Sequence, residues 1–225
     1  MNILETVAMP LGAVLLALAV CAAAETAPVE DEPGLPRVLI IGDSISAGYT
    51  PAVQALLRGD ANVHRIPPNG AHTRVGLANL DAWLGDTPWN VIHFNWGLHD
   101  LKIMEDGKQQ VPLEEYERNL RTLVERMQQT GATLVWCSTT PVPEGKVGPP
   151  RNPQDVIAYN AAARRVMDEH GVAVDDLYAF ALPRLEQLQQ PMNVHFTEQG
   201  SRALAEQVAT SIRRALVARR GQAQQ

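Results

Sequence analysis

Two side chains that suit nucleophilic chemistry stand near opposite ends of this chain of 225 residues. Ser44 directly follows the apolar run 38–41 through the turn Gly42-Asp43. His195 lies far downstream, in the segment Asn193-Val-His-Phe-Thr197. A serine hydroxyl becomes a good nucleophile only when a base takes its proton, and histidine is the side chain that most often does so. The pair therefore predicts a reaction in which Ser44 attacks and His195 moves the proton.

The elements that would position this pair alternate between strand and helix. Short apolar runs are typical of strands covered on both faces. Residues 112–129 repeat their apolar side chains at helical spacing most clearly. We expect strands at 38–41, 62–66, 89–94, 132–138 and 172–174, and helices at 51–58, 73–84, 112–129, 154–170 and 196–218. This order predicts a three-layer α/β/α, flavodoxin-like fold with a parallel sheet of about five strands. A serine just past a strand lies where such sheets bind ligands.

The charge distribution argues against a nucleic-acid-binding protein, and the cysteine content argues against a disulfide-stabilised fold. The net charge is −6, and basic residues cluster only at Arg213-Arg214 and Arg219-Arg220, so we expect no nucleic-acid partner. The chain has two cysteines, Cys21 and Cys137. If the first is removed with a leader, the second cannot form an internal disulfide, and we expect it to be a buried core residue.

The first 24 residues have the pattern of a secretory signal peptide. Residues 7–24 are uncharged and end in Ala22-Ala23-Ala24, which is a small-residue cleavage site. Two features depart from the usual pattern, namely Glu5 in place of a basic residue and Pro10 within the apolar run. We expect cleavage after Ala24 and export to the periplasm or the medium.

The rest of the chain divides in two. Residues 25–35 are acidic and contain proline, which is typical of a flexible leader, and residues 36–225 are long enough for one domain. After cleavage we expect no stable association with a membrane. Two alternatives stay open: an uncleaved membrane anchor, and lipidation of Cys21, because Leu18-Ala-Val-Cys21 is close to a lipobox.

Residues 37–218 resemble the SGNH hydrolases, the GDSL-type esterases and lipases. Gly42-Asp43-Ser44 is similar to the first motif of that family, and Gly70 stands where the family has its second-block glycine. Gly97-Leu98-His99-Asp100 lies at the third block, and His195 matches the last histidine. The resemblance implies an esterase that needs no cofactor and no metal, with Ser44 as nucleophile and the Gly70 N–H in the oxyanion hole. It also implies ester substrates, of which short acyl groups on carbohydrate are our first expectation.

The third block departs from the family pattern, which has Gly-x-Asn-Asp with the Asn side chain as an oxyanion donor. Here His99 occupies the Asn position. A neutral imidazole still has one N–H to donate if a partner orients the ring. Asn95 is the second candidate for the donor.

The last block also departs, because the family pattern is Asp-x-x-His and no carboxylate precedes His195. Met192 and Asn193 stand three and two residues before it. Asn193 can orient the imidazole by accepting a hydrogen bond, although it brings no charge. The other options are a Ser–His dyad, a carboxylate from Asp175 or Asp176, or weak or lost activity.

Three other functions compete with a short-acyl esterase. A lysophospholipase or thioesterase would use the same residues on longer acyl groups. A degenerate domain would bind carbohydrate without turnover. A metal-dependent hydrolase would use oxygen and imidazole ligands, and its candidate ligands are Asp43, Asn95, His99, Asp100 and His195.

We predict that the exported protein begins at Glu25 and carries one free thiol, because the cleavage site precedes that residue. Intact-mass analysis of the exported protein measures this. A diacylglyceryl mass on Cys21 would instead establish the lipoprotein alternative.

Overall fold

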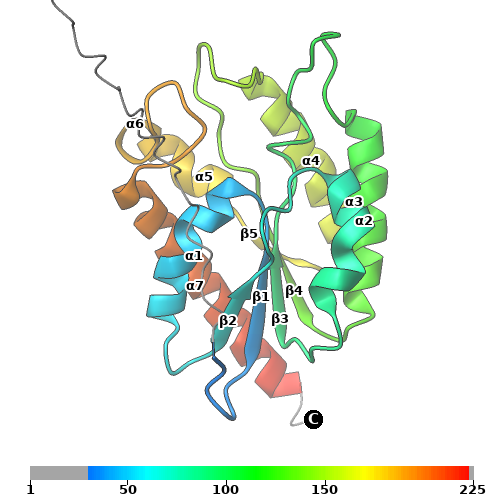
Figure 1. Ribbon diagram of the computed structural model, residues 1–225, viewed down its shortest axis with the longest axis vertical. Helices are drawn as coiled ribbons and strands as arrows, with labels where there is room; N and C mark the ends of the chain where they lie inside the picture. Colours follow the sequence, from blue (N-terminus) through cyan, green and yellow to red (C-terminus); the bar gives the residue numbers. More distant parts are fainter. Residues whose placement is uncertain (1–29, 223–225) are drawn as a thin grey trace, which may run out of the picture.

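The protein has a five-stranded parallel sheet with helices on both faces, as the computed structural model shows for residues 30–222 (Figure 1). The expected signal peptide and residues 25–29 of the acidic leader lie outside the described residues. The strands are β1 Arg37–Ile41, β2 Asn62–Arg65, β3 Val91–Phe94, β4 Thr133–Cys137 and β5 Ala173–Asp175. Their order in the sheet is β2-β1-β3-β4-β5, and every neighbouring pair is parallel. The predicted three-layer α/β/α class is confirmed.

Two groups of helices sandwich the sheet (Figure 1). One face is covered by α1 Ser44–Leu56 and α7 Glu198–Gln222, and the other by α2 Thr73–Leu84, α3 Leu113–Gln128 and α4 Pro153–His170. The short elements α5 Leu177–Ala181, η1 Leu182–Arg184 and α6 Leu185–Leu188 connect β5 to the segment before α7. No helix within residues 30–222 is both long and apolar enough to cross a membrane.

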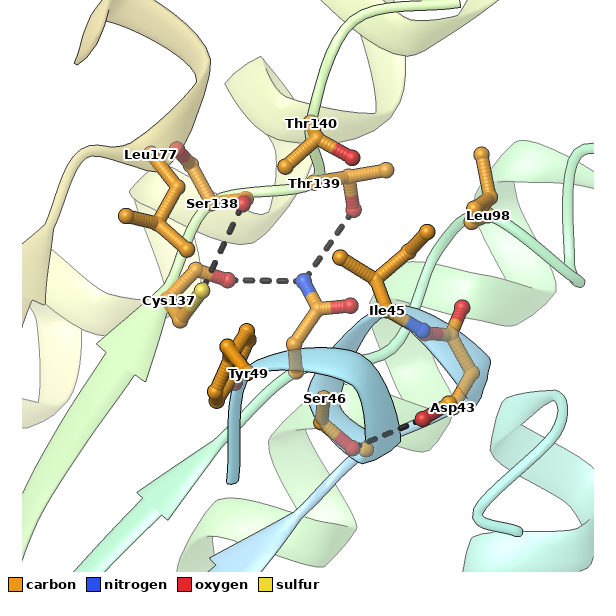
Figure 2. A pocket seen from close by; sticks show the side chains of 12 residues that line it. Asp43, Ile45, Ser46, Tyr49, Leu98, Cys137, Ser138, Thr139, Thr140 and Leu177 are labelled. Carbon is orange, nitrogen blue, oxygen red and sulfur yellow. Dashed lines mark hydrogen bonds between the residues drawn. The ribbon is translucent and has the colours of Figure 1, made fainter. Parts of the chain in front are cut away.

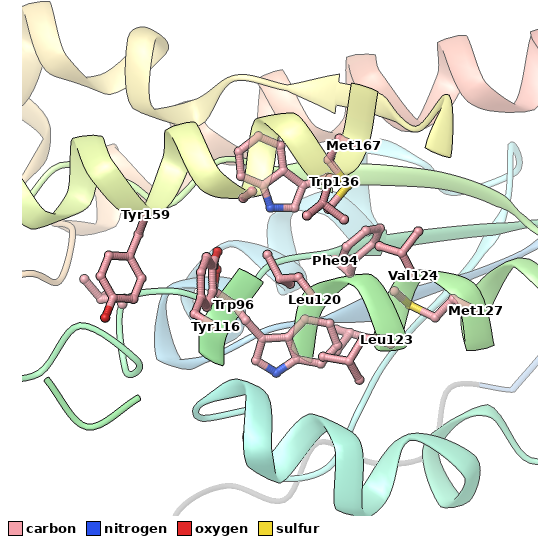
Figure 3. Packing of buried hydrophobic residues seen from close by; sticks show 14 of the residues in the cluster. Phe94, Trp96, Tyr116, Leu120, Leu123, Val124, Met127, Trp136, Tyr159 and Met167 are labelled. Atoms are coloured by element: carbon pink, nitrogen blue, oxygen red, sulfur yellow. The ribbon is translucent and has the colours of Figure 1, made fainter. Parts of the chain in front are cut away.

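The alternation of side chains along each strand builds two separate cores. In β1, Leu39 and Ile41 belong to the core under α2, α3 and α4, while Val38 and Ile40 belong to the core under α1 and α7. The first of these cores is rich in aromatic rings, and Figure 3 shows Phe94 among them, with its ring centroid 6.1 Å from that of Trp96. Because both faces of the central sheet are buried, β1 and β4 are mostly apolar and read as continuous runs, whereas the edge strand β2 contains polar residues.

The strand order fixes where a site can form. From β1 the chain goes to β2 on one side and then to β3 on the other, so the connections diverge between β1 and β3. At such a switch point the carboxyl ends of neighbouring strands leave a crevice. Ser44 follows β1 and residues 95–99 follow β3, so both segments reach this crevice.

One helix boundary differs from the prediction. We expected the first helix to begin near Pro51, whereas α1 begins at Ser44 and contains Pro51 in its interior. The N-cap is Asp43, whose Oδ1 accepts the Ile45 N–H at 2.9 Å. The cap therefore sets the start of the helix, and proline is accommodated two turns later.

A buried carboxylate ties α2 to the segment after β3. Asp100 is fully buried, and its Oδ1 accepts hydrogen bonds from the Thr73 N–H at 2.9 Å and from the Thr73 hydroxyl. It thus caps α2 from outside, because His72 at the N-cap makes no side-chain cap. The other oxygen, Oδ2, has no hydrogen-bond partner within residues 30–222. Burial raises the pKa of Asp100 to about 7.

We predict that this carboxyl makes unfolding pH-dependent. The folded pKa lies above the unfolded value near 3.8, so the folded state binds the proton more tightly, and stability falls as pH rises from about 4 to about 7. Asp100→Asn keeps the acceptor for Thr73 and removes the titration. Urea unfolding at pH 5 and pH 8 should show a smaller loss in the variant, by on the order of 1–3 kcal/mol. Equal losses in both proteins would contradict the raised pKa.

Candidate active site

The turn from β1 into α1 presents Ser44 at the carboxyl edge of the sheet. Ser44 is the first residue of α1, so its N–H has no acceptor within the helix. Asp43, which caps the helix, is buried, and this burial raises the pKa of Asp43. The serine hydroxyl and a free helix-terminal N–H therefore stand together, as a site that stabilises negative charge requires.

Arg65, at the end of β2, stabilises this turn through hydrogen bonds. Its guanidinium donates to the carbonyl of Asp43 at 3.0 Å, to the carbonyl of Pro68 at 2.9 Å and to the hydroxyl of Ser46 at 3.1 Å. Figure 2 shows a cavity beside this turn, which is lined in part by Ser46 and Ser138. Its volume is about 10 Å³, room for roughly one water molecule. The backbone that carries Ser44 is thus closely packed.

The structure brings Ser44 and His195 together. The Oγ atom of Ser44 lies 2.9 Å from Nε2 of His195, across 151 positions of sequence. The other ring nitrogen, Nδ1, lies 2.8 Å from Oδ1 of Asn193. Because an amide oxygen can only accept, Nδ1 carries the proton and Nε2 presents its lone pair to the serine hydroxyl. This is the tautomer that a general base needs.

Asn193 is itself held by two further contacts. Its Oδ1 also accepts the backbone N–H of His195 at 3.0 Å, and its Nδ2 donates to Oε1 of Gln190 at 3.2 Å. The second contact fixes which end of the amide faces the ring. Asn193 therefore occupies the orienting position that the family pattern gives to a carboxylate, as we expected for this residue.

The segment that carries His195 is folded back on itself before α7. A β-bridge joins Gln189 to Phe196, and the Gln190 N–H donates to the His195 carbonyl at 2.9 Å. Gly200 allows α7 to start against this segment, because a Cβ there would lie 2.0 Å from the carbonyl oxygen of Leu188. Steric contact with Leu188 therefore explains why a glycine stands at position 200.

The aspartates that we considered as alternatives make other contacts. Asp175 is buried, with Oδ2 3.0 Å from Nε2 of His93 and Oδ1 accepting from Gln207 at 3.0 Å. Asp176 caps α5 through the Ala179 N–H and accepts from the hydroxyl of Ser138. Nδ1 of His195 is bonded to Asn193 instead, so the structure does not support the alternative in which one of these carboxylates orients the ring.

Two of the three expected oxyanion donors are engaged elsewhere. The Gly70 N–H donates to the Gly42 carbonyl at 2.9 Å. The side-chain amide of Asn95 donates to the Cys137 carbonyl at 2.7 Å and to the Thr139 hydroxyl at 3.2 Å, which ties the ends of β3 and β4 together (Figure 2). Both hydrogens of the Asn95 amide are therefore used, which excludes it as a free donor in this arrangement. Gly70 could donate to an oxyanion only by sharing its N–H hydrogen with the Gly42 carbonyl.

His99 is the third expected donor, and its Nε2 has no hydrogen-bond partner among residues 30–222. Its Nδ1 lies 2.9 Å from Nζ of Lys102. Burial, together with the positive charges of Lys102, Arg151, His72 and His195, lowers the pKa of His99 to about 4. The ring is therefore neutral near pH 7.

Three basic residues of the site were missed from the sequence. Arg65 and Lys102 have no recognisable motif, and Arg151 lies in the proline-rich loop after β4. Arg151 is buried and donates from Nε to the Leu98 carbonyl at 2.7 Å, so it braces the turn that carries His99. The pattern of residue types gave no signal for them because they bind mainly backbone carbonyls, a hydroxyl or a single ring.

The side chains that we weighed as metal ligands are employed differently. Asp43 caps α1, Asp100 caps α2 and Asn95 joins two strands. Within residues 30–222, no group of three or more His, Cys, Asp and Glu side chains is arranged to hold a metal ion.

Comparison with known proteins agrees with this geometry. The chain is 26% identical over 215 residues to a GDSL esterase/lipase of Arabidopsis thaliana, covering 79% of this chain and 86% of that protein. Among solved structures, a lipase/acylhydrolase from Enterococcus faecalis superposes with a TM-score of 0.69 at 19% identity, covering 79% of this chain and 95% of that one. An acetyl xylan esterase superposes with a TM-score of 0.68 at 16% identity, covering 78% and 99%. At these identities the two structures show a shared fold.

The sequence model of the GDSL-like Lipase/Acylhydrolase family matches residues 40–203. The match begins in β1, just before the serine turn, and ends in α7, just after His195. It therefore contains every part of the crevice described above, and the chain belongs to the GDSL-like lipase/acylhydrolase family of carboxylic-ester hydrolases.

Proposed function

We propose that this protein is an exported serine esterase that removes short acyl groups, acetyl first, from carbohydrate. The observation that carries the proposal is the 2.9 Å contact between Ser44 Oγ and His195 Nε2, with Nδ1 held by Asn193. That arrangement supplies a nucleophile, a base in the right tautomer, and a residue that orients the base.

In the first half-reaction, Ser44 Oγ attacks the ester carbonyl carbon while Nε2 of His195 takes its proton. The tetrahedral intermediate then collapses, the bond to the alcohol oxygen breaks, and His195 gives the proton to that oxygen. The products are the free alcohol and an acyl ester on Ser44.

In the second half-reaction, His195 takes a proton from water, and the resulting hydroxide attacks the acyl carbonyl. Collapse of this intermediate breaks the bond to Oγ, returns the proton to Ser44 and releases the carboxylic acid. His195 is exposed at the surface, so water reaches it without a conformational change. No cofactor takes part.

The oxyanion forms in both half-reactions and needs donors. The Ser44 N–H is free at the start of α1, and the helix terminus itself favours negative charge. His99 offers an unpartnered Nε2, whereas Gly70 contributes only if its hydrogen bond to Gly42 is shared.

Two observations support a carbohydrate ester as substrate. The fold is shared with an acetyl xylan esterase. In addition, a cavity of about 620 Å³ adjoins the segment before His195. Its lining includes Met192 together with the polar side chains of Glu144, Arg184 and Gln187, which suit the hydroxyl groups of a sugar.

We predict that the wild-type protein hydrolyses acetyl esters, including acetylated xylo-oligosaccharides, at least about tenfold faster than dodecanoyl esters. Ser44→Ala should lower kcat on the order of a thousandfold or more while leaving the melting temperature nearly unchanged, because it removes only the nucleophile. Kinetics on a panel of acetyl to dodecanoyl esters, with and without chelator, measures both.

Ser211→Ala, which removes a hydroxyl in the middle of α7, is the matched control. Retention of more than about a tenth of the activity by Ser44→Ala would refute the serine mechanism. A maximum at long acyl chains would favour a lysophospholipase or thioesterase. Loss of activity with chelator would favour a metal enzyme, and glycan binding without turnover a degenerate domain.

We predict that Asn193→Asp raises kcat at neutral pH, by up to about tenfold, because a carboxylate stabilises the imidazolium that an amide cannot. The acidic limb of the pH–rate profile should move to higher pH for the same reason. Asn193→Ala should lower kcat on the order of tenfold or more, since it removes the acceptor that keeps the hydrogen of His195 on Nδ1.

Asn79→Asp, an exposed asparagine on α2, controls for the added charge. If Asn193→Asp and the wild type have superimposable profiles, Asn193 does not act on the ring during turnover. The amide would then only stabilise the turn through its bonds to Gln190 and to the backbone of His195.

A further inference from the structure

We propose that Lys102 is a positioning residue that holds His99 in the Nε2–H tautomer, so that His99 donates this hydrogen to the oxyanion. The inference rests on the proposed function and names a residue outside the family's motifs. It explains how a histidine works at a position where the family pattern has a side-chain amide.

The geometry of the contact decides where the proton lies. Nζ of Lys102 is 2.9 Å from Nδ1 of His99. An ammonium group has three donors and no acceptor, so Nδ1 must present its lone pair to it. A neutral ring with an accepting Nδ1 carries its hydrogen on Nε2, the atom without a partner in the described part of the chain.

The turn after β3 brings the two residues together. The Leu101 N–H donates to the Gly97 carbonyl at 2.9 Å, and the Lys102 N–H to the His99 carbonyl at 3.4 Å. Gly97 has φ of +148°, and a Cβ there would lie 2.2 Å from the Thr139 hydroxyl, so only glycine fits. This turn folds Lys102 back over the ring of His99, three residues earlier.

The environment of Lys102 does not suit a purely structural lysine. It is half-buried, and within residues 30–222 no carboxylate forms an ion pair with it. Burial lowers the pKa of Lys102, and Arg151 lowers it further, with only Asp43 acting in the opposite direction. Its side-chain hydrogen bond is the one to His99. An unpaired, partly desolvated cation costs stability, which is a reason to seek a functional role.

The charge around the ring keeps it neutral. Besides burial, which has the largest effect, the charges that lower the pKa of His99 are those of Lys102, Arg151, His72 and His195. All of them disfavour a proton on Nδ1. The ring therefore remains a neutral donor with one defined hydrogen near pH 7.

The test compares Lys102→Met in two backgrounds. In the wild type we expect kcat on acetyl esters to fall about tenfold with little change in KM, because the donor acts on the transition state. In His99→Asn the amide has a fixed donor that needs no lysine, so Lys102→Met should cause no further loss. Lys108→Met, an exposed lysine of the same loop, is the control.

A spectroscopic measurement keeps the test decisive if His99→Asn is poorly active. ¹⁵N NMR of labelled histidine should show His99 with Nδ1 unprotonated and Nε2 protonated, and Lys102→Met should give a mixture of tautomers. Equal losses from Lys102→Met in both backgrounds, or an unchanged tautomer, would overturn the proposal. Activity that survives Ser44→Ala would overturn the proposed function instead, while the NMR result would still report on the tautomer.

Discussion

The hydrogen bond between Ser44 and His195 is the contact on which the site depends, and it joins residues 151 positions apart. Ser44 is fixed by the cap at Asp43 and by Arg65, which grips the carbonyl groups of the same turn. His195 is fixed by the folded segment that Gly200 allows to lie against α7. A contact of 2.9 Å between such distant segments exists only when both sides are rigid, so the packing of α1 and α7 on one face is a condition for the chemistry.

The site orients its base without adding negative charge. An amide at Asn193 fixes the tautomer of His195 but leaves the imidazolium without a charge partner. The surroundings are instead basic, with Lys102 and Arg151 on the side of the crevice that carries His99. These positive charges stabilise the anionic oxygen of the tetrahedral intermediate and do not stabilise the cationic ring of His195.

The fold could be predicted from the sequence because both faces of the sheet are buried at its centre, which makes β1 and β4 nearly continuous apolar runs. The bounds of α2 were predicted as observed, since its apolar residues repeat at helical spacing. The start of α1 was missed because the cap at Asp43 outweighs the proline signal at Pro51. The engagement of Gly70 and Asn95 was not predictable either, since it depends on how closely strand ends approach.

The two histidines of the crevice illustrate what residue type alone leaves open. In the proposed mechanism His195 and His99 both act as neutral imidazoles, but they need opposite tautomers. His195 contacts an acceptor, the oxygen of Asn193, and so keeps its hydrogen on Nδ1 and offers a lone pair to Ser44. His99 contacts a donor, the ammonium of Lys102, and so keeps its hydrogen on Nε2. The identity of the partner, one an acceptor and the other a donor, therefore decides which ring takes a proton and which ring donates a hydrogen bond. Both departures from the family motif are consistent with one catalytic plan once these partners are included.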